Sequence, residues 1–335
     1  MENHPRRPRL VSVVCPVFNE EAGIRLFAER LLGVLDGLGV PYEVLFVEDD
    51  SPDGSLAVLR QLSAQYGPRV KVLSLSRRFG HQASLAAGFH HCRGDVMICM
   101  DSDLQHPPEM LPEMLEYWAQ GYQIVYTCRR RQADRGRLKE LVSRSFYHVL
   151  DLLSEVRFEE GTADFRLMDR TVVNALEQFE ERSLFIRGLI NWMGYRRKKL
   201  EYDAPPRVAG KSQYSFGRML GMGLEAIFSF SLLPLRLSHV IGAGGMLASL
   251  VYAVWVLAEW LSGRLETPGY ASLCMLITFM GSLNLLCLGI TAEYIGRIHR
   301  QTQKRPLYLI KEQIGFDWTH ANANADRGMR EIHAA

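Results

Sequence analysis

Two aspartates stand one residue apart in the segment ICMDSDLQHPPE, residues 98–109. Asp101 and Asp103 follow a short apolar run, so two carboxylates sit at the end of a strand that should be buried. Such charges repel one another unless a cation lies between them. Mg²⁺ and Mn²⁺ suit oxygen ligands, and Mg²⁺ binds one or two carboxylates together with substrate phosphates. The pattern predicts a metal and phosphate site; the alternative is an N-cap for the helix that Pro107-Pro108-Glu109 opens, with Asp103 merely solvated.

Elements that could position these carboxylates are found in the first 130 residues. Short β-branched runs predict strands, and the longer stretches between them predict helices. The strands are expected at 10–15, 42–47, 70–75, 96–100 and 124–127, and helices at 20–38 and 54–66. This alternation predicts a mostly parallel sheet with helices on both faces, which binds ligands at the carboxyl ends of its strands. Acidic turns after three strands should therefore meet at one edge.

Glycine-rich phosphate cradles are absent from the sequence. No GxGxxG follows the first strand, and GKS at 210–212 is not a P-loop because Pro205 stands where the leading glycine belongs. A nucleotide bound here needs a metal for its diphosphate, and side chains such as Asp49 and Glu20 for its base and ribose. The formal net charge of +2 gives no argument for nucleic acid, and the six cysteines without a CxxC pair argue against a zinc site.

The C-terminal third has the composition of a membrane anchor. Residues 240–258 and 269–292 carry no formal charge, and each run is long enough to cross a bilayer core of about 20 helical residues. Residues 214–236 carry three charges among apolar side chains, which favours interfacial helices. The alternatives are a buried helical hairpin and packing on the soluble domain. Four basic residues in 296–305 predict that both termini are cytoplasmic, and no secretory signal is expected at the N-terminus.

Five segments in register resemble the polyprenyl-phosphate glycosyltransferases, a branch of the inverting nucleotide-sugar transferases. They are PVFNEE at 16–21, EDDSPDGS at 48–55, RRFGHQASLAAGF at 77–89, MDSDLQHPPE at 100–109 and GTADFRLMDR at 161–170. The resemblance is greatest to the bactoprenol glucosyltransferases of lipopolysaccharide O-antigen modification, and dolichol-phosphate mannose synthases look like relatives. It implies a GT-A type, mostly parallel sheet with helices on both faces, followed by interfacial helices and a two-helix transmembrane hairpin.

The resemblance also implies a domain layout. A tail at 1–9 precedes a cytoplasmic nucleotide-sugar transferase domain at 10–213. Interfacial amphipathic helices follow at 214–236, then two transmembrane helices within 237–295, at about 237–261 and 269–292. A cytoplasmic C-terminal tail occupies 296–335.

Roles on the donor side follow from the resemblance residue by residue. The nucleotide-binding residues would be Pro16, Phe18, Glu20, Asp49 and Asp101, with Asp49 contacting the base. The metal ligands, for Mg²⁺ or Mn²⁺, would be Asp101, Asp103 and Gln105. His106 is expected beside the site or exposed, because a hard cation prefers oxygen. Glu48 and Asp50 depart from the family's DDGS or DDAS, which leaves base specificity open.

Roles on the acceptor side fall to basic residues. The clusters 129–144 and 196–218 each carry seven Lys or Arg against two acids, and a solvated face or attraction to anionic lipid accounts for most of them. The residues matching an acceptor-phosphate site are Arg129, Arg144, Arg207 and Lys211, although Gln213 replaces an expected lysine. Asp164 is a base, an orienter of an acceptor arginine, or a turn-stabilising residue. The catalytic set is Asp103, Asp164, Arg129 and Arg144.

The implied reaction moves a hexose, with glucose favoured, from a nucleotide diphosphate sugar to a polyprenyl phosphate such as undecaprenyl phosphate, with inversion. A UDP-sugar is favoured as donor, while GDP-mannose and other sugars (mannose, galactose, GlcNAc, aminoarabinose) stay open. Competing hypotheses are transfer to a soluble acceptor and a membrane scaffold that binds nucleotide sugar without turnover. The resemblance further implies a multi-pass inner-membrane protein, a homo-oligomer, and no nucleic-acid partner.

Overall fold

The computed structural model describes residues 6–130, 162–179, 186–203, 233–262 and 269–316. The chain divides into two compact units, one built on the sheet and one holding the two long C-terminal helices. Several expected features lie outside the described residues: Arg144, Arg207, Lys211 and most of the interfacial segment, 214–232.

Eight strands form one mixed sheet in the order β7-β5-β6-β4-β1-β2-β3-β8. Among the described strands, β6 and β8 alone run against the other six. The GT-A type, mostly parallel sheet that the resemblance implied is therefore confirmed. The strands are β1 Val11–Val17, β2 Tyr42–Glu48, β3 Val70–Leu75, β4 Val96–Cys99, β5 Ile124–Arg129, β6 Thr162–Asp169, β7 Arg197–Tyr202 and β8 Ile310–Ile314.

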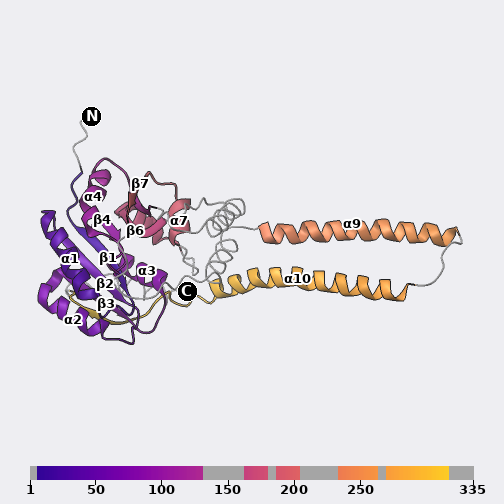
Figure 1. Ribbon diagram of the computed structural model, residues 1–335, viewed down its shortest axis with the longest axis horizontal. Helices are drawn as coiled ribbons and strands as arrows, with labels where there is room; N and C mark the ends of the chain where they lie inside the picture. The colour runs from indigo at the N-terminus through magenta and orange to yellow at the C-terminus, as the bar shows by residue number, and fades with distance from the viewer. Residues whose placement is uncertain (1–5, 131–161, 180–185, 204–232, 263–268, 317–335) are drawn as a thin grey trace, which may run out of the picture. The chain divides into compact units, whose positions relative to one another are not determined.

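Helices cover both faces of the sheet because side chains alternate along each strand. Val13 of β1 belongs to one apolar cluster with Phe27 and Leu31 of α1. The next residue, Val14, faces α3, which approaches so closely that a Cβ on Gly88 would lie 2.1 Å from Val14 Cγ1. Figure 1 shows α1 and α2 on one side of β1 to β3 and α3 on the other. The helices of this unit are α1 Ile24–Gly37, α2 Ser55–Tyr66, α3 His81–His91, α4 Leu111–Ala119, α6 Arg170–Leu176 and α7 Ile186–Trp192, with 3-10 turns η1 Gly67–Arg69 and η2 Pro108–Met110.

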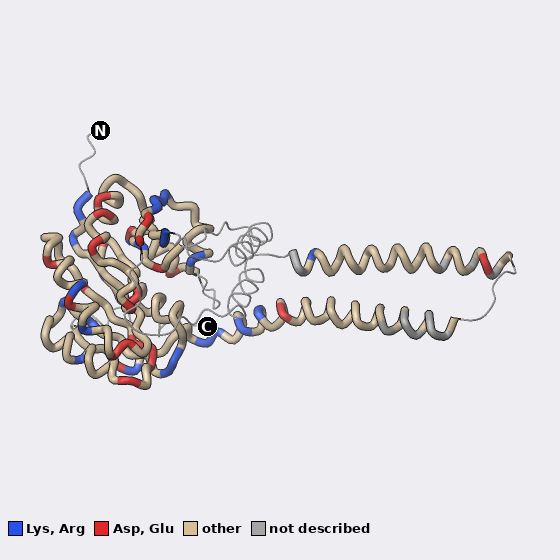
Figure 2. The backbone as a smooth tube through the Cα atoms, viewed as in Figure 1, with Lys and Arg blue, Asp and Glu red and all other residues tan. Residues whose placement is uncertain are grey.

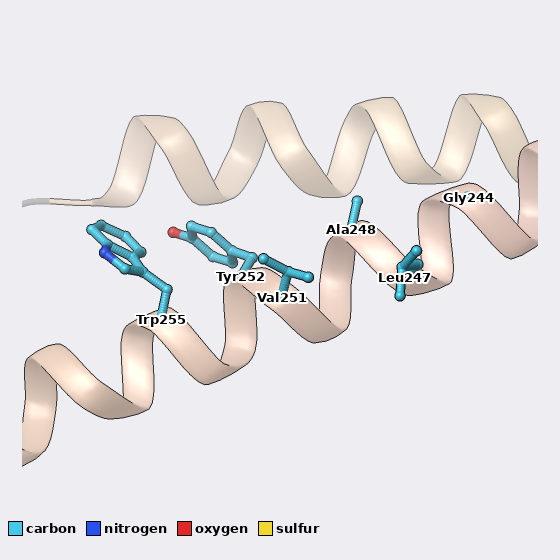
Figure 3. Close-up of a pocket in the computed structure, with 6 residues that line it drawn as sticks. All are labelled: Gly244, Leu247, Ala248, Val251, Tyr252 and Trp255. Atoms are coloured by element: carbon cyan, nitrogen blue, oxygen red, sulfur yellow. The ribbon is translucent and has the colours of Figure 1, made fainter.

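Two long helices, α9 Leu233–Leu261 and α10 Tyr270–Thr302, make up the described part of the second unit. Within them, Leu235–Val256 and Phe279–Thr302 are long and apolar enough to cross a membrane. Figure 2 shows charged residues only near the ends of these helices, and most large apolar side chains along them are exposed. Six residues of α9, from Gly244 to Trp255, line an apolar groove (Figure 3). The pair has the length and composition of a transmembrane hairpin.

Residues beyond α10 rejoin the sheet unit. β8 pairs antiparallel with β3 and extends the sheet at its edge. Just before β8, the carbonyl of Leu309 accepts a hydrogen bond of 2.8 Å from the backbone N–H of Ser76. Arg60 of α2 forms an ion pair with Glu312. The stretch expected as a tail from residue 296 thus continues α10 to Thr302 and then contributes a strand.

Candidate active site

The DSD turn begins where β4 ends and is held against β1. Met100, the residue before it, is buried and donates its backbone N–H to the carbonyl of Val14 at 3.0 Å. Ser102 Oγ donates to the carbonyl of Pro16 at 2.8 Å. Leu104 has a φ of 62°, a left-handed conformation that costs a non-glycine residue roughly 1–2 kcal/mol. The turn is therefore a fixed, strained structure that brings Asp101 and Asp103 to the carboxyl edge of the sheet.

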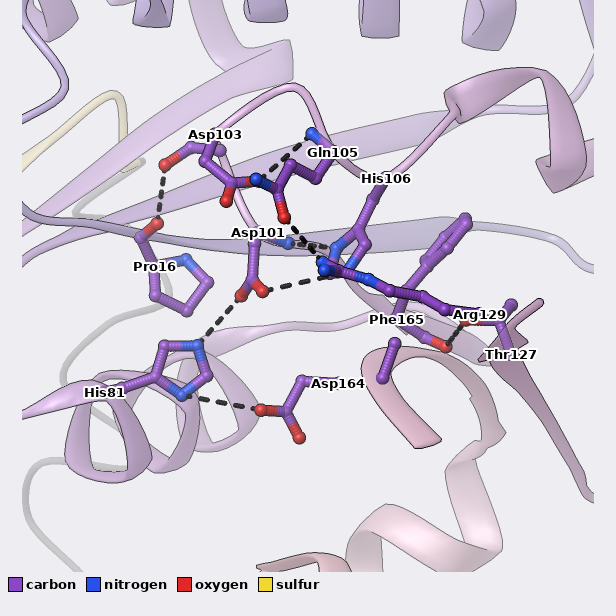
Figure 4. A network of polar contacts seen from close by, with 12 residues as sticks. Pro16, His81, Asp101, Asp103, Gln105, His106, Thr127, Arg129, Asp164 and Phe165 are labelled. Atoms are coloured by element: carbon purple, nitrogen blue, oxygen red, sulfur yellow. Dashed lines mark hydrogen bonds and ion pairs between the residues drawn. The ribbon is translucent and has the colours of Figure 1, made fainter. Parts of the chain in front are cut away.

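Asp101 lies between two histidines (Figure 4). His81 Nε2, at the first residue of α3, lies 2.9 Å from Asp101 Oδ1 and donates to it, since an ionised carboxylate can only accept. His106 Nε2 lies 3.7 Å from Asp101 Oδ2. Burial would raise the pKa of Asp101, but the contacts with His106 and His81 hold that pKa below its ordinary value. Asp101 is therefore an ionised carboxylate at neutral pH.

His106 supports the turn from inside the protein. Its side chain is 1% exposed and stacks on Phe165 with ring centroids 5.2 Å apart. Its Nδ1 accepts the backbone N–H of Asp101 at 3.0 Å, and burial lowers the pKa of His106, so the ring is the neutral acceptor that this contact requires. Of the two expectations for His106, a place beside the site is confirmed and exposure is wrong.

Asp103 and Gln105 point toward different partners. Asp103 Oδ1 accepts the backbone N–H of Gln105 at 3.1 Å. The Gln105 side chain is buried, and its Oε1 accepts a 2.7 Å hydrogen bond from Arg129 Nη2. Arg129 Nε in turn donates to the hydroxyl of Tyr202 at 3.1 Å. The turn thus holds the guanidinium of Arg129 near the carboxylates. The alternative that this turn supplies the N-cap of the following helix is wrong, because Pro107 occupies that position before η2.

The oxygen donors of this turn fit a cation shared with a diphosphate. Among the described residues, no three His, Cys, Asp or Glu side chains converge as a metal cage would require. Mg²⁺ needs no such cage, because it binds one or two carboxylates together with phosphate oxygens. Asp103 is partly exposed at the edge, and Asp101 is 32% exposed although it contacts His81. Gln105 presents its amide oxygen to Arg129, which leaves the two carboxylates as the better placed donors.

Asp164 lies on β6 and is shared by two arginines. Arg187 of α7 forms a bidentate pair with it, at 2.7 Å from Nε to Oδ1 and 2.7 Å from Nη2 to Oδ2. Arg166 Nη2 donates to Asp164 Oδ1 at 3.1 Å. Burial would raise the pKa of Asp164, but the charges of Arg187 and Arg166 outweigh burial and hold that pKa well below its ordinary value. The turn-stabilising alternative is wrong because the residue is on a buried strand. A carboxylate held this way suits an orienting role better than that of a base.

Asp49 is cradled by the loop that precedes α3. Its carboxylate oxygens accept the backbone N–H groups of Phe79 at 2.7 Å and Gly80 at 2.8 Å. Gly80 has a φ of 98°, a conformation that favours glycine, and this lets the loop bend back onto the carboxylate. Burial raises the pKa of Asp49, although the two N–H donors act in the opposite direction. Asp49 therefore holds the loop 76–80 at the end of β2. The resemblance assigns this same residue to contact with the nucleobase of the donor.

The turns after β1 and β2 are joined by side chains. The backbone N–H of Glu20 donates to Ser55 Oγ at 2.9 Å, and the N–H of Glu21 donates to Asp53 Oδ2 at 3.1 Å. The guanidinium of Arg78 lies 3.9 Å from the centroid of the Phe18 ring. Pro16 lies within β1. The structure thus brings Pro16, Phe18, Glu20, Asp49 and Asp101 to one edge of the sheet, as their positions in the sequence predict.

Three residues of this network were not among the predicted site residues. His81 contacts Asp101 and lies 3.9 Å from Asp164, measured from Nδ1 to Oδ2. Arg166 and Arg187 flank Asp164. His81 and Arg187 contact carboxylates that other elements supply, so local spacing could not reveal them, whereas Arg166 lies on the same strand as its partner Asp164. The acid two residues before Arg166 was the one available hint.

Known proteins resemble the chain over most of its length. Residues 12–187 match the family described as Glycosyl transferase family 2. An uncharacterized glycosyltransferase of Synechocystis sp. is 38% identical over 308 residues, which cover 92% of this chain and 96% of that protein. The bactoprenol glucosyl transferase of Shigella phage SfX is 36% identical over 90% of this chain and 99% of its own length. A prophage bactoprenol glucosyl transferase homolog of Escherichia coli K12 is 35% identical, over 90% of this chain and 98% of its own length.

Proposed function

We propose, since the chain belongs to glycosyl transferase family 2, that it transfers a hexose from a nucleotide diphosphate sugar to a polyprenyl phosphate. The observation that carries this proposal is that the similarity to a bactoprenol glucosyl transferase extends over nearly the full length of both proteins. The relative from phage SfX is named a bactoprenol glucosyl transferase, and the match takes in 99% of it. The matched length of 303 residues extends well beyond the family domain at 12–187. Glucose is the first sugar to test, with undecaprenyl phosphate as acceptor.

The geometry supports a donor site at the carboxyl edge of the sheet. Asp49, Glu20 and Phe18 would hold the nucleoside, and Asp101 and Asp103 would face the diphosphate. A bound Mg²⁺ or Mn²⁺ would neutralise the charge that develops on the leaving diphosphate. Arg129, fixed by Gln105 and Tyr202, offers a guanidinium whose geometry suits phosphate.

The acceptor phosphate is itself the nucleophile in the proposed reaction. One phosphate oxygen attacks the anomeric carbon from the face opposite the diphosphate, the bond from that carbon to the diphosphate oxygen breaks, and the configuration inverts. A phosphate oxygen is ionised at neutral pH, so no side chain has to remove a proton. The state of Asp164, a carboxylate held by two arginines, agrees with this. Catalysis then depends on positioning and charge stabilisation.

The two apolar helices support a membrane location. Their exposed apolar surface and lack of charge would be costly in water, and a bilayer would cover them. Arg297, Arg300, Lys304 and Arg305 follow the second run, so both termini would face the cytoplasm of a cell whose inner membrane holds the protein. We also propose that the protein forms a homo-oligomer, and this part of the proposal rests on the family resemblance alone.

The proposed function is tested by following radiolabel from UDP-glucose into an organic extract, with undecaprenyl phosphate and Mn²⁺ present. We expect label in the organic phase that depends on both the lipid and the metal. The same assay with GDP-mannose and other nucleotide sugars identifies the donor. Absence of extractable label with every donor would overturn the proposal, whereas label with a soluble sugar acceptor would redirect it.

A further inference from the structure

Arg78 is a charged residue at the carboxyl edge of the sheet that the proposed function leaves without a role. It lies in the loop 76–80, between the end of β3 and the start of α3, and its side chain is exposed. Its guanidinium lies over the ring of Phe18, the residue that follows β1. Building on the proposed function, we propose that Arg78 selects the nucleobase of the donor by donating hydrogen bonds to a carbonyl oxygen of that base.

The first argument is location. β1, β2 and β3 are neighbours in the sheet and run parallel, so their carboxyl ends meet. Phe18 and Asp49 directly follow β1 and β2, and Arg78 comes shortly after β3. Burial raises the pKa of Asp49, and the charge of Arg78 acts in the opposite direction, so these two side chains are close enough to interact. A nucleoside held by Phe18 and Asp49 would therefore lie beside Arg78.

The second argument is the fixed backbone around Arg78. Before it, the N–H of Ser76 donates to the carbonyl of Leu309 at 2.8 Å. After it, the next two backbone N–H groups donate to the carboxylate of Asp49 at 2.7 and 2.8 Å. The place of Arg78 at the edge of the sheet is therefore set before a nucleotide binds.

The third argument is the state of the Arg78 side chain. Its guanidinium carbon lies 3.9 Å from the centroid of the Phe18 ring, which is a cation–π contact. The ring orients the guanidinium but does not neutralise it. Among the described residues, no carboxylate forms an ion pair with Arg78, and no group accepts a hydrogen bond from its guanidinium. Its N–H donors are therefore available to a ligand, and an arginine oriented in advance loses less conformational entropy when it binds.

The fourth argument is the chemistry of the bases. A guanidinium donates hydrogen bonds and cannot accept them. Uracil carries a carbonyl oxygen where cytosine carries an amino group, and guanine carries one where adenine carries an amino group. An amino group facing Arg78 would set donor against donor and leave both without a partner. Arg78 should therefore favour uracil over cytosine and guanine over adenine, which agrees with a UDP-sugar or a GDP-sugar as donor.

The test compares nucleotides that differ at this one position of the base. Full-length protein is titrated by calorimetry with UDP and with CDP in the presence of Mn²⁺, or with GDP and ADP if the wild type binds GDP. We expect the wild type to prefer the nucleotide with the carbonyl. In Arg78→Gln the side-chain amide can donate or accept, so the preference, measured as the ratio of the two Kd values, should fall by about ten-fold.

Two further variants make the result specific. Arg78→Lys keeps a side chain that can only donate, and it should retain part of the preference. Arg77→Gln is the matched control, because Arg77 is the exposed neighbour whose guanidinium lies 4.2 Å from the centroid of the Phe79 ring. This control should keep the wild-type ratio, and its thermal unfolding midpoint should match that of Arg78→Gln.

Other roles for Arg78 give other results. A contact with the diphosphate would weaken UDP and CDP by the same factor, and so would a purely structural role. An unchanged ratio of the two Kd values in Arg78→Gln therefore overturns the proposal. If Arg78→Gln fails to fold, Arg78→Met keeps an unbranched chain over Phe18 without any donor. In that variant too, a lost preference supports the proposal and a retained preference overturns it.

The two proposals can fail separately. If the wild type makes no lipid-linked product, the proposed function fails, and the titrations with UDP and CDP still decide the role of Arg78. If the wild type transfers sugar to the lipid while Arg78→Gln keeps the wild-type preference, only the role of Arg78 fails. A wild type that binds UDP no better than CDP, and GDP no better than ADP, also overturns it, because no preference is then left for Arg78 to explain.

Discussion

The imidazole of His81 lies between two carboxylates, with Nε2 2.9 Å from Asp101 Oδ1 and Nδ1 3.9 Å from Asp164 Oδ2. Asp101 belongs to the turn after β4, and Asp164 belongs to β6, the antiparallel neighbour of that strand. One ring on α3 therefore connects the two acidic groups on which the candidate site is built. It does so although its side chain is 40% exposed.

Replacing His81 by alanine should impair transfer without unfolding the protein. The change removes the donor that fixes Asp101, and a lost hydrogen bond to a charged group corresponds to roughly a ten-fold fall in kcat/KM. Steady-state kinetics with the nucleotide sugar varied measures it. His90→Ala is the control, because His90 lies on the same helix but contacts Tyr308 through its Nδ1 at 2.9 Å. If the two variants are equally active, Asp101 does not depend on His81.

Asp103→Ala should abolish the metal dependence of nucleotide binding. In wild-type protein we expect Mn²⁺ to tighten UDP binding, since in the proposed site the cation would be bound by both the carboxylates of the turn and the diphosphate. The variant should bind UDP with the same affinity with or without Mn²⁺, as measured by calorimetry. Asp95→Ala serves for comparison, because Asp95 stands just before the other end of β4 and accepts the backbone N–H of Arg9 at 2.7 Å. A variant at position 103 that keeps the full Mn²⁺ effect would remove this residue from the metal site.

Asp49→Asn tests the cradle formed by Phe79 and Gly80. An asparagine keeps one acceptor oxygen but turns an NH₂ group toward the second backbone N–H, which leaves a buried donor unsatisfied at a cost of about 1–3 kcal/mol. We expect a lower thermal unfolding midpoint and weaker UDP binding. Asp50→Asn is the matched control at the neighbouring residue. The side chain of Asp50 is exposed, and its φ of 52° suits asparagine. Equal midpoints for the two variants would show that the cradle contributes nothing.

Sequence patterns predicted the central parallel strands of the sheet because these strands are nearly continuous apolar runs. All seven residues of β1 are buried, as are six of seven in β2. The same reasoning missed β6, where Asp164, Arg166 and Asp169 interrupt the pattern. These polar groups are buried only because distant partners meet them, as when Trp118 Nε1 donates to Asp169 Oδ2 at 2.8 Å. β7, with the sequence RKKLEY, is an edge strand whose charges hide its period.

The residues of the candidate site likewise include some that the sequence predicts and some that it does not. Asp101, Asp103 and Asp49 could be predicted because each follows a strand, and parallel strands end at a common edge. His81 could not, since only the packing of α3 against β1 at Gly88 brings its ring to Asp101. The contact of Gln105 with Arg129 likewise depends on β5 lying in the sheet next to β6. Spacing therefore identifies the acids, and tertiary packing decides what each acid touches.

Glu43→Gln should reveal a pH-dependent part of the stability at the opposite end of β2. Glu43 accepts hydrogen bonds of 2.6 Å from Ser12 Oγ, from the backbone N–H of Arg93 and from Lys71 Nζ. Burial would raise the pKa of Glu43, but the contacts with Lys71, Ser12 and Arg93 lower it below its ordinary value. A lowered pKa in the folded state stabilises the protein above the unfolded pKa of about 4.3, and this stabilisation is lost as pH falls through the folded value.

Thermal unfolding between pH 7 and pH 3 measures that contribution. The midpoint of Glu43→Gln should lie below that of wild type at pH 7, and the difference should shrink as the pH drops below about 4.3. Glu29→Gln, on an exposed position of α1, should follow the wild-type curve throughout. A difference that stays constant over the whole range would mean that the ionised carboxylate of Glu43 is not what stabilises the fold.

Removing the chain from residue 305 onward should destabilise the sheet unit, because β8 would be lost from its edge. Without β8, the edge of β3 loses the ladder formed by Val72 with Ile314 and Leu73 with Gln313. The N–H of Ser76 loses the carbonyl of Leu309, at the start of the loop that cradles Asp49. We therefore expect both a lower thermal midpoint and weaker UDP binding. Truncation after residue 316 retains β8 and should match the full chain. If the shorter truncation product binds UDP as tightly as the longer one, β8 does not influence the loop 76–80 that cradles Asp49.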